Sequence, residues 1–104
     1  YTARASYALN KAFGAPIGKA FGITVGAPAG IGVVLADTAV KAATVDVIGY
    51  ASPAGGTSYS NEVISFLSGD SGAVRQAIIA AREVGIPLLG ALGAKPESTT
   101  TPYI

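Results

Sequence analysis

Large apolar residues recur at every second position between Lys19 and Gly26. Phe21, Ile23 and Val25 alternate there with small or polar residues. Side chains two residues apart fall on the same face of a strand, so this segment predicts a β-strand with those three side chains on one side.

Two further segments, 45–51 and 62–68, are rich in β-branched and aromatic residues, which favour strands. Residues 52–61 between them are mostly Ser, Gly, Asn, Pro and Thr, which favour turns. The pattern predicts an antiparallel pair of strands that is joined by a long loop.

Helical patterns lie on both sides of the first predicted strand. Residues 3–13 are good helix formers and end at Gly14, a residue type that commonly terminates helices. Residues 31–43 place Asp37 and Lys41 four positions apart, so we expect these two side chains to pair on the exposed side of a helix. The residues expected to face inward from this second helix are Ile31, Val34, Leu35 and Ala42.

The strongest helical pattern begins at residues 69–72, where Asp70 or Ser71 is expected to act as the N-terminal cap. Gly85 is expected to end this helix. Arg75 and Arg82 lie outside its apolar stripe and receive no role from the sequence. The stripe that should be buried consists of Val74, Ala77, Ile78 and Ala81.

The predicted order of elements is therefore helix, strand, helix, strand, strand, helix. Residues 87–92 are expected to add a short strand, and residues 95–104 form a polar tail with no apolar core of its own. Because helices must bury their apolar stripes, we expect an α/β domain in which helices pack on a mainly antiparallel sheet.

Composition excludes several classes of function. A formal charge of +1 on 104 residues is too small for a protein that neutralises nucleic-acid phosphates. The chain has no Cys and no His, which removes the commonest metal ligands and the commonest general base, and its carboxylates show no paired spacing. We therefore expect no metal, no cofactor, no catalytic residue and no enzymatic activity. No apolar run reaches the ~20 residues of a membrane span, so we expect a cytosolic protein.

The glycine-rich segment Gly26–Gly32 leaves one enzymatic alternative open. Loops between a strand and a helix can bind phosphate through backbone amides at the helix N-terminus. The spacing here is not G-x-G-x-x-G, Pro28 lacks an amide donor, and no Lys-Ser/Thr pair follows. A nucleotide-binding enzyme or regulatory trimer that uses this loop is the weaker interpretation.

Several stretches resemble bacterial microcompartment shell domains. Residues 37–50 (DTAVKAATVDVIGY) resemble their D-x-x-x-K-A-A motif with its closing Tyr, and residues 69–75 (GDSGAVR) resemble the G-D-x-x-A-V-[KR] that opens their second core helix. The order and spacing match, and the resemblance covers nearly the whole chain. Residues 1–20, 52–63 and 69–85 are most similar to the second half of trimeric tandem shell proteins of the PduB/EtuB type.

This resemblance implies a ferredoxin-like shell domain over residues 1–94 and a C-terminal tail over residues 95–104. A helix comes first here, whereas single-domain members place a strand and a helix last, which implies a circular permutation. The PduB/EtuB-type class implies two such domains per full chain, of which the first half is absent here, and three chains in a pseudohexameric ring. The implied function is structural: a tile in the shell of a cytoplasmic compartment for propanediol, ethanol or glycerol utilisation.

The resemblance also implies two functional sites in this chain. Lys41 matches the lysine at the edge where neighbouring tiles meet, and the plain alternative is a solvated lysine paired with Asp37. The loop 52–61 matches the position that lines the central pore, and the plain alternative is a flexible loop. The implied partners are other shell proteins and small polar metabolites such as propanediol, glycerol or ethanol, with no nucleic acid and no membrane. The pore-lining candidates are Gly55, Gly56, Thr57, Ser58 and Tyr59.

Overall fold

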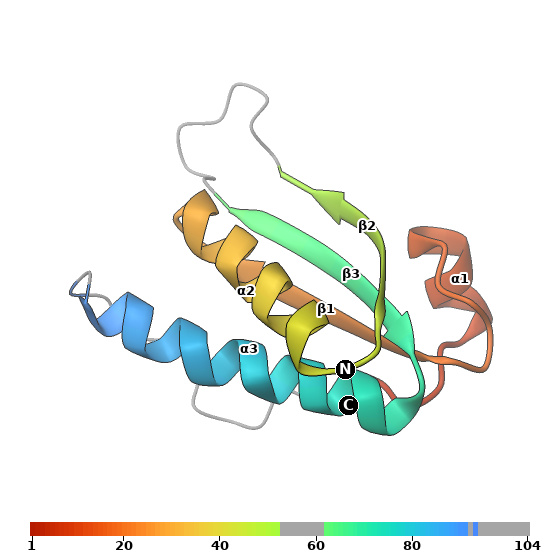
Figure 1. The fold of residues 1–104 in the computed structure, drawn as a ribbon. Coiled ribbons are helices and arrows are strands. Elements are labelled where there is room, and N and C mark those ends of the chain that lie inside the picture. Colours follow the sequence, from red (N-terminus) through yellow and green to blue (C-terminus); the bar gives the residue numbers. More distant parts are fainter. Residues whose placement is uncertain (53–61, 92, 94–104) are drawn as a thin grey trace.

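The computed structural model of the chain describes residues 1–52, 62–91 and 93. Helices α2 and α3 cover one face of a three-stranded sheet, and α1 lies against one end of the opposite face (Figure 1). The elements follow in the predicted order: α1 (Tyr7–Phe13), β1 (Ala20–Gly26), α2 (Ala29–Ala42), β2 (Asp46–Ala51), β3 (Val63–Gly69) and α3 (Ser71–Ala91).

The sheet has the order β1-β3-β2, and both pairs of neighbours are antiparallel. β3 is the central strand: Phe66 lies opposite Ile23 of β1 and opposite Gly49 of β2. The predicted antiparallel pair, β2 and β3, is therefore confirmed. So is the expected fold class, helices packed on an antiparallel sheet.

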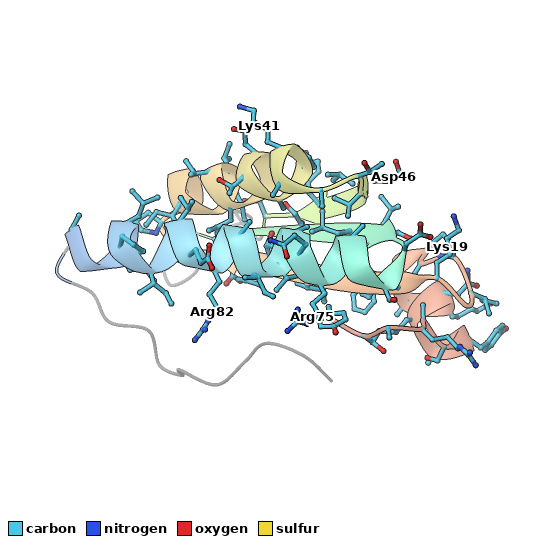
Figure 2. All side chains as sticks on the ribbon, turned by 60° about the horizontal axis from the view of Figure 1, so that its bottom comes forward. Lys19, Lys41, Asp46, Arg75 and Arg82 are labelled. Carbon is cyan, nitrogen blue, oxygen red and sulfur yellow. The ribbon has the colours of Figure 1, made fainter. Side chains whose placement is uncertain are left out.

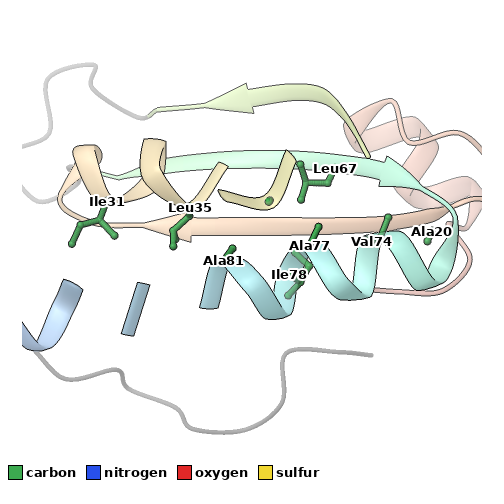
Figure 3. Close-up of a cluster of buried hydrophobic side chains, with 9 residues drawn as sticks. Ala20, Ile31, Leu35, Leu67, Val74, Ala77, Ile78 and Ala81 are labelled. Atoms are coloured by element: carbon green, nitrogen blue, oxygen red, sulfur yellow. The ribbon is translucent and has the colours of Figure 1, made fainter. Parts of the chain in front are cut away.

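The main core lies between the sheet and the two helices α2 and α3 (Figure 3). All four residues of the predicted stripe on α3 are buried there, and so are Ile31 and Leu35 of α2. The prediction was wrong for Val34 and Ala42, which are exposed. Ala39 is buried instead, because Ile31, Leu35 and Ala39 lie one turn apart on the side of α2 that rests on the sheet.

The face of β1 that the helices cover is the one with small residues. Ala20 and Gly22 point toward α3, whereas Ile23 and Val25 are exposed on the opposite face. A Cβ on Gly22 would lie 2.9 Å from Cγ1 of Val74. The missing side chain therefore lets α3 approach the strand closely.

The opposite face of the sheet holds a second, aromatic cluster. The rings of Phe13, Phe21 and Phe66 have centroids 5.1 to 6.2 Å apart. α1, which carries Phe13, is shorter than predicted because Thr2 pairs with Phe21 at the edge of β1. The helix starts only after Ser6, whose hydroxyl accepts a hydrogen bond from the Leu9 amide.

α3 does not end at Gly85 but continues to Ala91, with Pro87 inside it. The short strand expected at 87–92 is therefore wrong for the residues that the structure describes. Gly85 is buried, and a Cβ there would lie 2.7 Å from Cδ2 of Leu35, so the glycine allows α2 and α3 to pack closely. The expected tail, 95–104, lies outside the described residues.

Candidate functional site

Lys41 and Asp37 form the predicted ion pair on α2. The Lys41 Nζ lies 2.7 Å from the Asp37 Oδ2, and the two side chains are 74% and 56% exposed. Such a pair contributes only about 0.3–0.5 kcal/mol to a helix. An ammonium has three N–H donors, so Lys41 keeps donors for a second partner while Asp37 holds it in place.

The position of Lys41 is set by the end of α2. The helix ends at Ala42, and residues 43–45, of which Ala43 is extended, connect it to β2. Lys41 therefore stands in the last helical turn, where the unpaired carbonyl groups of the helix favour a positive charge. Figure 2 shows its side chain directed away from the body of the domain.

The loop between β2 and β3 is closed at its base by a hydrogen bond. The Ser52 hydroxyl donates to the Glu62 carbonyl oxygen at 2.9 Å, just beyond the paired residues Ala51 and Ile64. Ser52 and Glu62, the residues at the two ends of the loop, therefore lie next to each other. The pore-lining candidates Gly55, Gly56, Thr57, Ser58 and Tyr59 lie outside the described residues.

Lys41 and the base of the loop lie at opposite ends of β2. Lys41 lies in the last turn of α2, five residues before β2 begins at Asp46, and Ser52 directly follows the last residue of β2, Ala51. A strand of six residues spans about 20 Å at ~3.3 Å per residue. In Figure 1, the end of α2 and the last residue of β2 accordingly lie at opposite ends of the sheet.

The Gly26–Gly32 loop is explained by packing. A Cβ on Gly26 would lie 2.6 Å from the Gly32 amide nitrogen, and a Cβ on Gly32 would lie 2.6 Å from Val63. Pro28, which follows a cis peptide bond, precedes α2 without a side-chain cap. The groove beside it is apolar and has no cationic side chain in its described lining, which consists of Pro28, Gly30, Ile31, Val34, Leu88 and Ala91.

Arg75 and Arg82 lie on the far side of the domain from Lys41. Both side chains point the same way from α3 in Figure 2, one heptad apart. Neither forms an ion pair within the described part of the chain. Sequence reasoning found these residues but could not place them relative to the other charges.

Within the described ranges the chain has neither a metal-binding cluster nor a membrane-spanning helix. No group of three or more carboxylates, His or Cys lies close enough together to hold a metal ion. None of the helices in the described ranges has the length and apolar character needed to cross a bilayer.

Both the sequence and the fold are shared with proteins of known kind. The family described as BMC domain matches residues 20–94. A bacterial microcompartment shell protein PduB of Citrobacter freundii is 64% identical over 104 residues, which make up all of this chain and 38% of that protein.

Two solved structures match most of the chain. A trimeric bacterial microcompartment shell protein PduB gives a TM-score of 0.83 at 50% identity, over 98% of this chain and 45% of that one. EtuB from Clostridium kluyveri gives 0.81 at 50% identity, over 94% of this chain and 44% of that one. The chain therefore spans less than half the length of these relatives.

Proposed function

The chain belongs to the BMC-domain family of bacterial microcompartment shell proteins, and we propose that the full-length protein is a trimeric shell tile with a central pore. In this proposal, two shell domains per chain and three chains form a ring of six domains. A closed ring buries the domain flanks and leaves an opening on its axis. The role is structural, and no residue of this chain is assigned to catalysis.

The observation that carries the proposal is the separation of Lys41 from the base of the β2–β3 loop. A domain in a ring needs one end at the axis and the other at the rim. β2, which is about 20 Å long, lies between these two features along the chain. An ammonium at one end and a loop at the other suit a contact between tiles and the lining of a pore.

We assign the domain to residues 1–94 and the tail to residues 95–104. The order of elements, with α1 before β1, supports a circularly permuted shell domain. The identity to the PduB of Citrobacter freundii covers 38% of that protein, which leaves room for a second domain of similar size. The ring of six domains rests on this tandem arrangement and on the trimeric PduB structure.

The pore assignment rests on the composition of the loop. Gly55, Gly56, Thr57, Ser58 and Tyr59 offer hydroxyl groups and backbone amides. Such groups exchange weak hydrogen bonds with polar solutes without retaining them. The permeants proposed are small alcohols of the propanediol, glycerol and ethanol class, which pass through the shell of a compartment in the cytoplasm.

Lys41 is proposed as the contact between neighbouring tiles. Its side chain is exposed and oriented by Asp37. In the assembled shell its remaining N–H groups donate to carbonyl oxygens of the adjacent tile, and its aliphatic stem packs on the neighbouring stem.

The experiment is the solution mass of the full-length protein, together with electron microscopy at high concentration. Wild type is expected to form trimers that pack into sheets or tubes. Lys41→Asp is expected to remain trimeric but to lose the packing, because a carboxylate cannot donate to carbonyl oxygens. Lys11→Asp is the matched control, since Lys11 is an exposed lysine of α1.

Other outcomes would contradict parts of the proposal. If the wild-type protein is a monomer, the proposal that it is a trimeric shell tile is wrong. If Lys41→Asp forms sheets as well as wild type does, Lys41 is not the contact between tiles. Discrete rings that never pack would leave open a second alternative, an oligomeric scaffold that is not part of a shell. Saturable binding of ATP or NAD that is lost in Gly30→Phe would revive the nucleotide alternative; Gly30 suits this test because a Cβ there meets nothing within 4 Å.

A further inference from the structure

Within the described part of the chain, the Lys41 ammonium has one charged partner. Its Nζ lies 2.7 Å from Oδ2 of Asp37, and no other described carboxylate forms an ion pair with it. Asp46 lies on the same side of the domain as Lys41 in Figure 2, but it is exposed and has no ion-pair partner among the described residues. Among these residues, the charge of Lys41 is therefore balanced by Asp37 alone.

The domain itself gains little from this ion pair. Both side chains are largely exposed, so water screens their attraction. α2 is held in place by the burial of Ile31, Leu35 and Ala39 on its other side. Lys41 also suits its position without a partner, because the last turn of a helix favours a positive charge. The fold therefore does not depend on Asp37, which is available for a contact outside the domain.

A contact between tiles through Lys41 brings like charges together. In the proposed edge contact, the aliphatic stem of Lys41 packs on the lysine stem of the adjacent tile, so the two ammonium groups approach each other. Like charges that face each other across an interface oppose association. Their repulsion grows as the contact excludes water, because the effective dielectric constant falls. An edge contact made by lysines therefore needs negative charge close to each ammonium.

We infer that Asp37 is the charge-balancing residue of the edge contact: its carboxylate neutralises Lys41 within the same tile, so that two lysine stems can pack side by side. The inference rests on the proposed function and deepens it. Asp37 lies one turn before Lys41 on the same helix, so each tile supplies its own negative charge at the edge. The contact then requires no acidic residue on the adjacent tile.

The geometry of the pair suits this role. An acidic residue four positions before a lysine is the favourable order for an ion pair on a helix, so the two side chains meet without distortion of α2. The Asp37 carboxylate accepts one hydrogen bond from the Lys41 ammonium. The ammonium keeps two N–H groups for carbonyl oxygens of the adjacent tile. Asp37 can thus balance the charge of Lys41 without occupying the donors that the contact uses.

The test measures the concentration at which the full-length protein forms sheets, at two salt concentrations. Asp37→Asn removes the negative charge and keeps the size of the side chain. At about 0.01 M salt, where the screening length is ~30 Å, this variant is expected to need a roughly tenfold higher protein concentration than wild type. At about 1 M salt, where the screening length is ~3 Å, the difference should fall to about twofold or less.

Two control variants separate this role from net charge and from the stability of α2. Asp46→Asn removes the same charge from the same side of the domain but not from Lys41, so it should form sheets as wild type does at both salt concentrations. Asp37→Glu keeps a carboxylate four positions before Lys41 and should retain the packing of wild type. If Asp37 only supported α2, added salt would weaken wild type, whereas the inference requires that salt improves the assembly of Asp37→Asn.

The outcomes separate the two proposals. If wild type forms no sheets, or if Lys41→Asp forms them equally well, the proposed function or its edge contact fails, and the inference fails with it. If sheets require Lys41 but Asp37→Asn forms them at low salt as readily as wild type or more readily, only the inference is wrong. A shift that Asp46→Asn reproduces also overturns it. Weak packing of Asp37→Asn that salt restores, with normal packing of Asp37→Glu, supports it.

Discussion

The close approach of α3 to β1 at Gly22 allows a quantitative prediction. Adding one methyl group, in Gly22→Ala, places a Cβ 2.9 Å from Cγ1 of Val74 and 3.1 and 3.2 Å from two carbons of Ile78. Carbon atoms pack best at about 3.5–4.0 Å, so both side chains must move. Overpacking of this kind costs about 1–3 kcal/mol. The alanine recovers about 0.4–1 kcal/mol by restricting the unfolded chain, so we expect a net loss of about 1–2 kcal/mol.

Two further variants test the cause of that loss. Gly30→Ala is the control for the backbone effect, because a Cβ at Gly30 meets nothing within 4 Å and the residue lies in α2. It should stabilise the domain by about 0.5–1 kcal/mol. Val74→Ala removes the nearest clashing carbon, so Gly22→Ala should cost at least ~1 kcal/mol less in that background than in wild type.

The assay is equilibrium urea unfolding of the chain, of the three single variants and of the double variant Gly22→Ala/Val74→Ala, followed by circular dichroism and analysed at a common m-value. The reasoning is refuted if Gly22→Ala is as stabilising as Gly30→Ala. It is also refuted if the changes in the free energy of unfolding caused by Gly22→Ala and Val74→Ala are additive within ~0.5 kcal/mol. Additivity would mean that the two residues do not interact.

Two local features give further predictions. Ser6→Ala should destabilise the chain by about 1 kcal/mol, because the Leu9 amide loses its cap, whereas Ser6→Asp should retain most of the stability; urea midpoints of the two variants check this. Pro87→Ala should raise the melting temperature by several degrees, because it restores an amide donor inside α3, with Pro16→Ala, outside any helix, as the control that should not.

The sequence predicted those features in which local pattern and burial agree. The stripe on α3 around Val74 and Ile78 was correct because apolar residues at helical spacing fall on one side of a helix whatever it packs against. The pairing of β2 with β3 was correct because consecutive strands joined by a turn-rich loop pair antiparallel. The ion pair of Asp37 with Lys41 needed only helical geometry.

What the sequence could not show depends on contacts between distant segments. The face of β1 covered by helices is the small one, because Gly22 admits α3, and periodicity alone does not indicate which face is covered. Gly85 is of a residue type that commonly ends helices, but here it lies inside α3 and packs against Leu35. The bulge at Ile48, which aligns Val47 with Tyr50, leaves no recognisable trace in residue type.

The hydrogen bond from Ser52 to the Glu62 carbonyl has a consequence for how such a protein can change. It fixes the two ends of the β2–β3 loop independently of what lies between them. Because the entropic cost of closing a loop rises only slowly with its length, a change in the number of residues between Ser52 and Glu62 is expected to cost the sheet little stability. Evolution or protein design can therefore change the sequence between Ser52 and Glu62 while the sheet and helices stay the same.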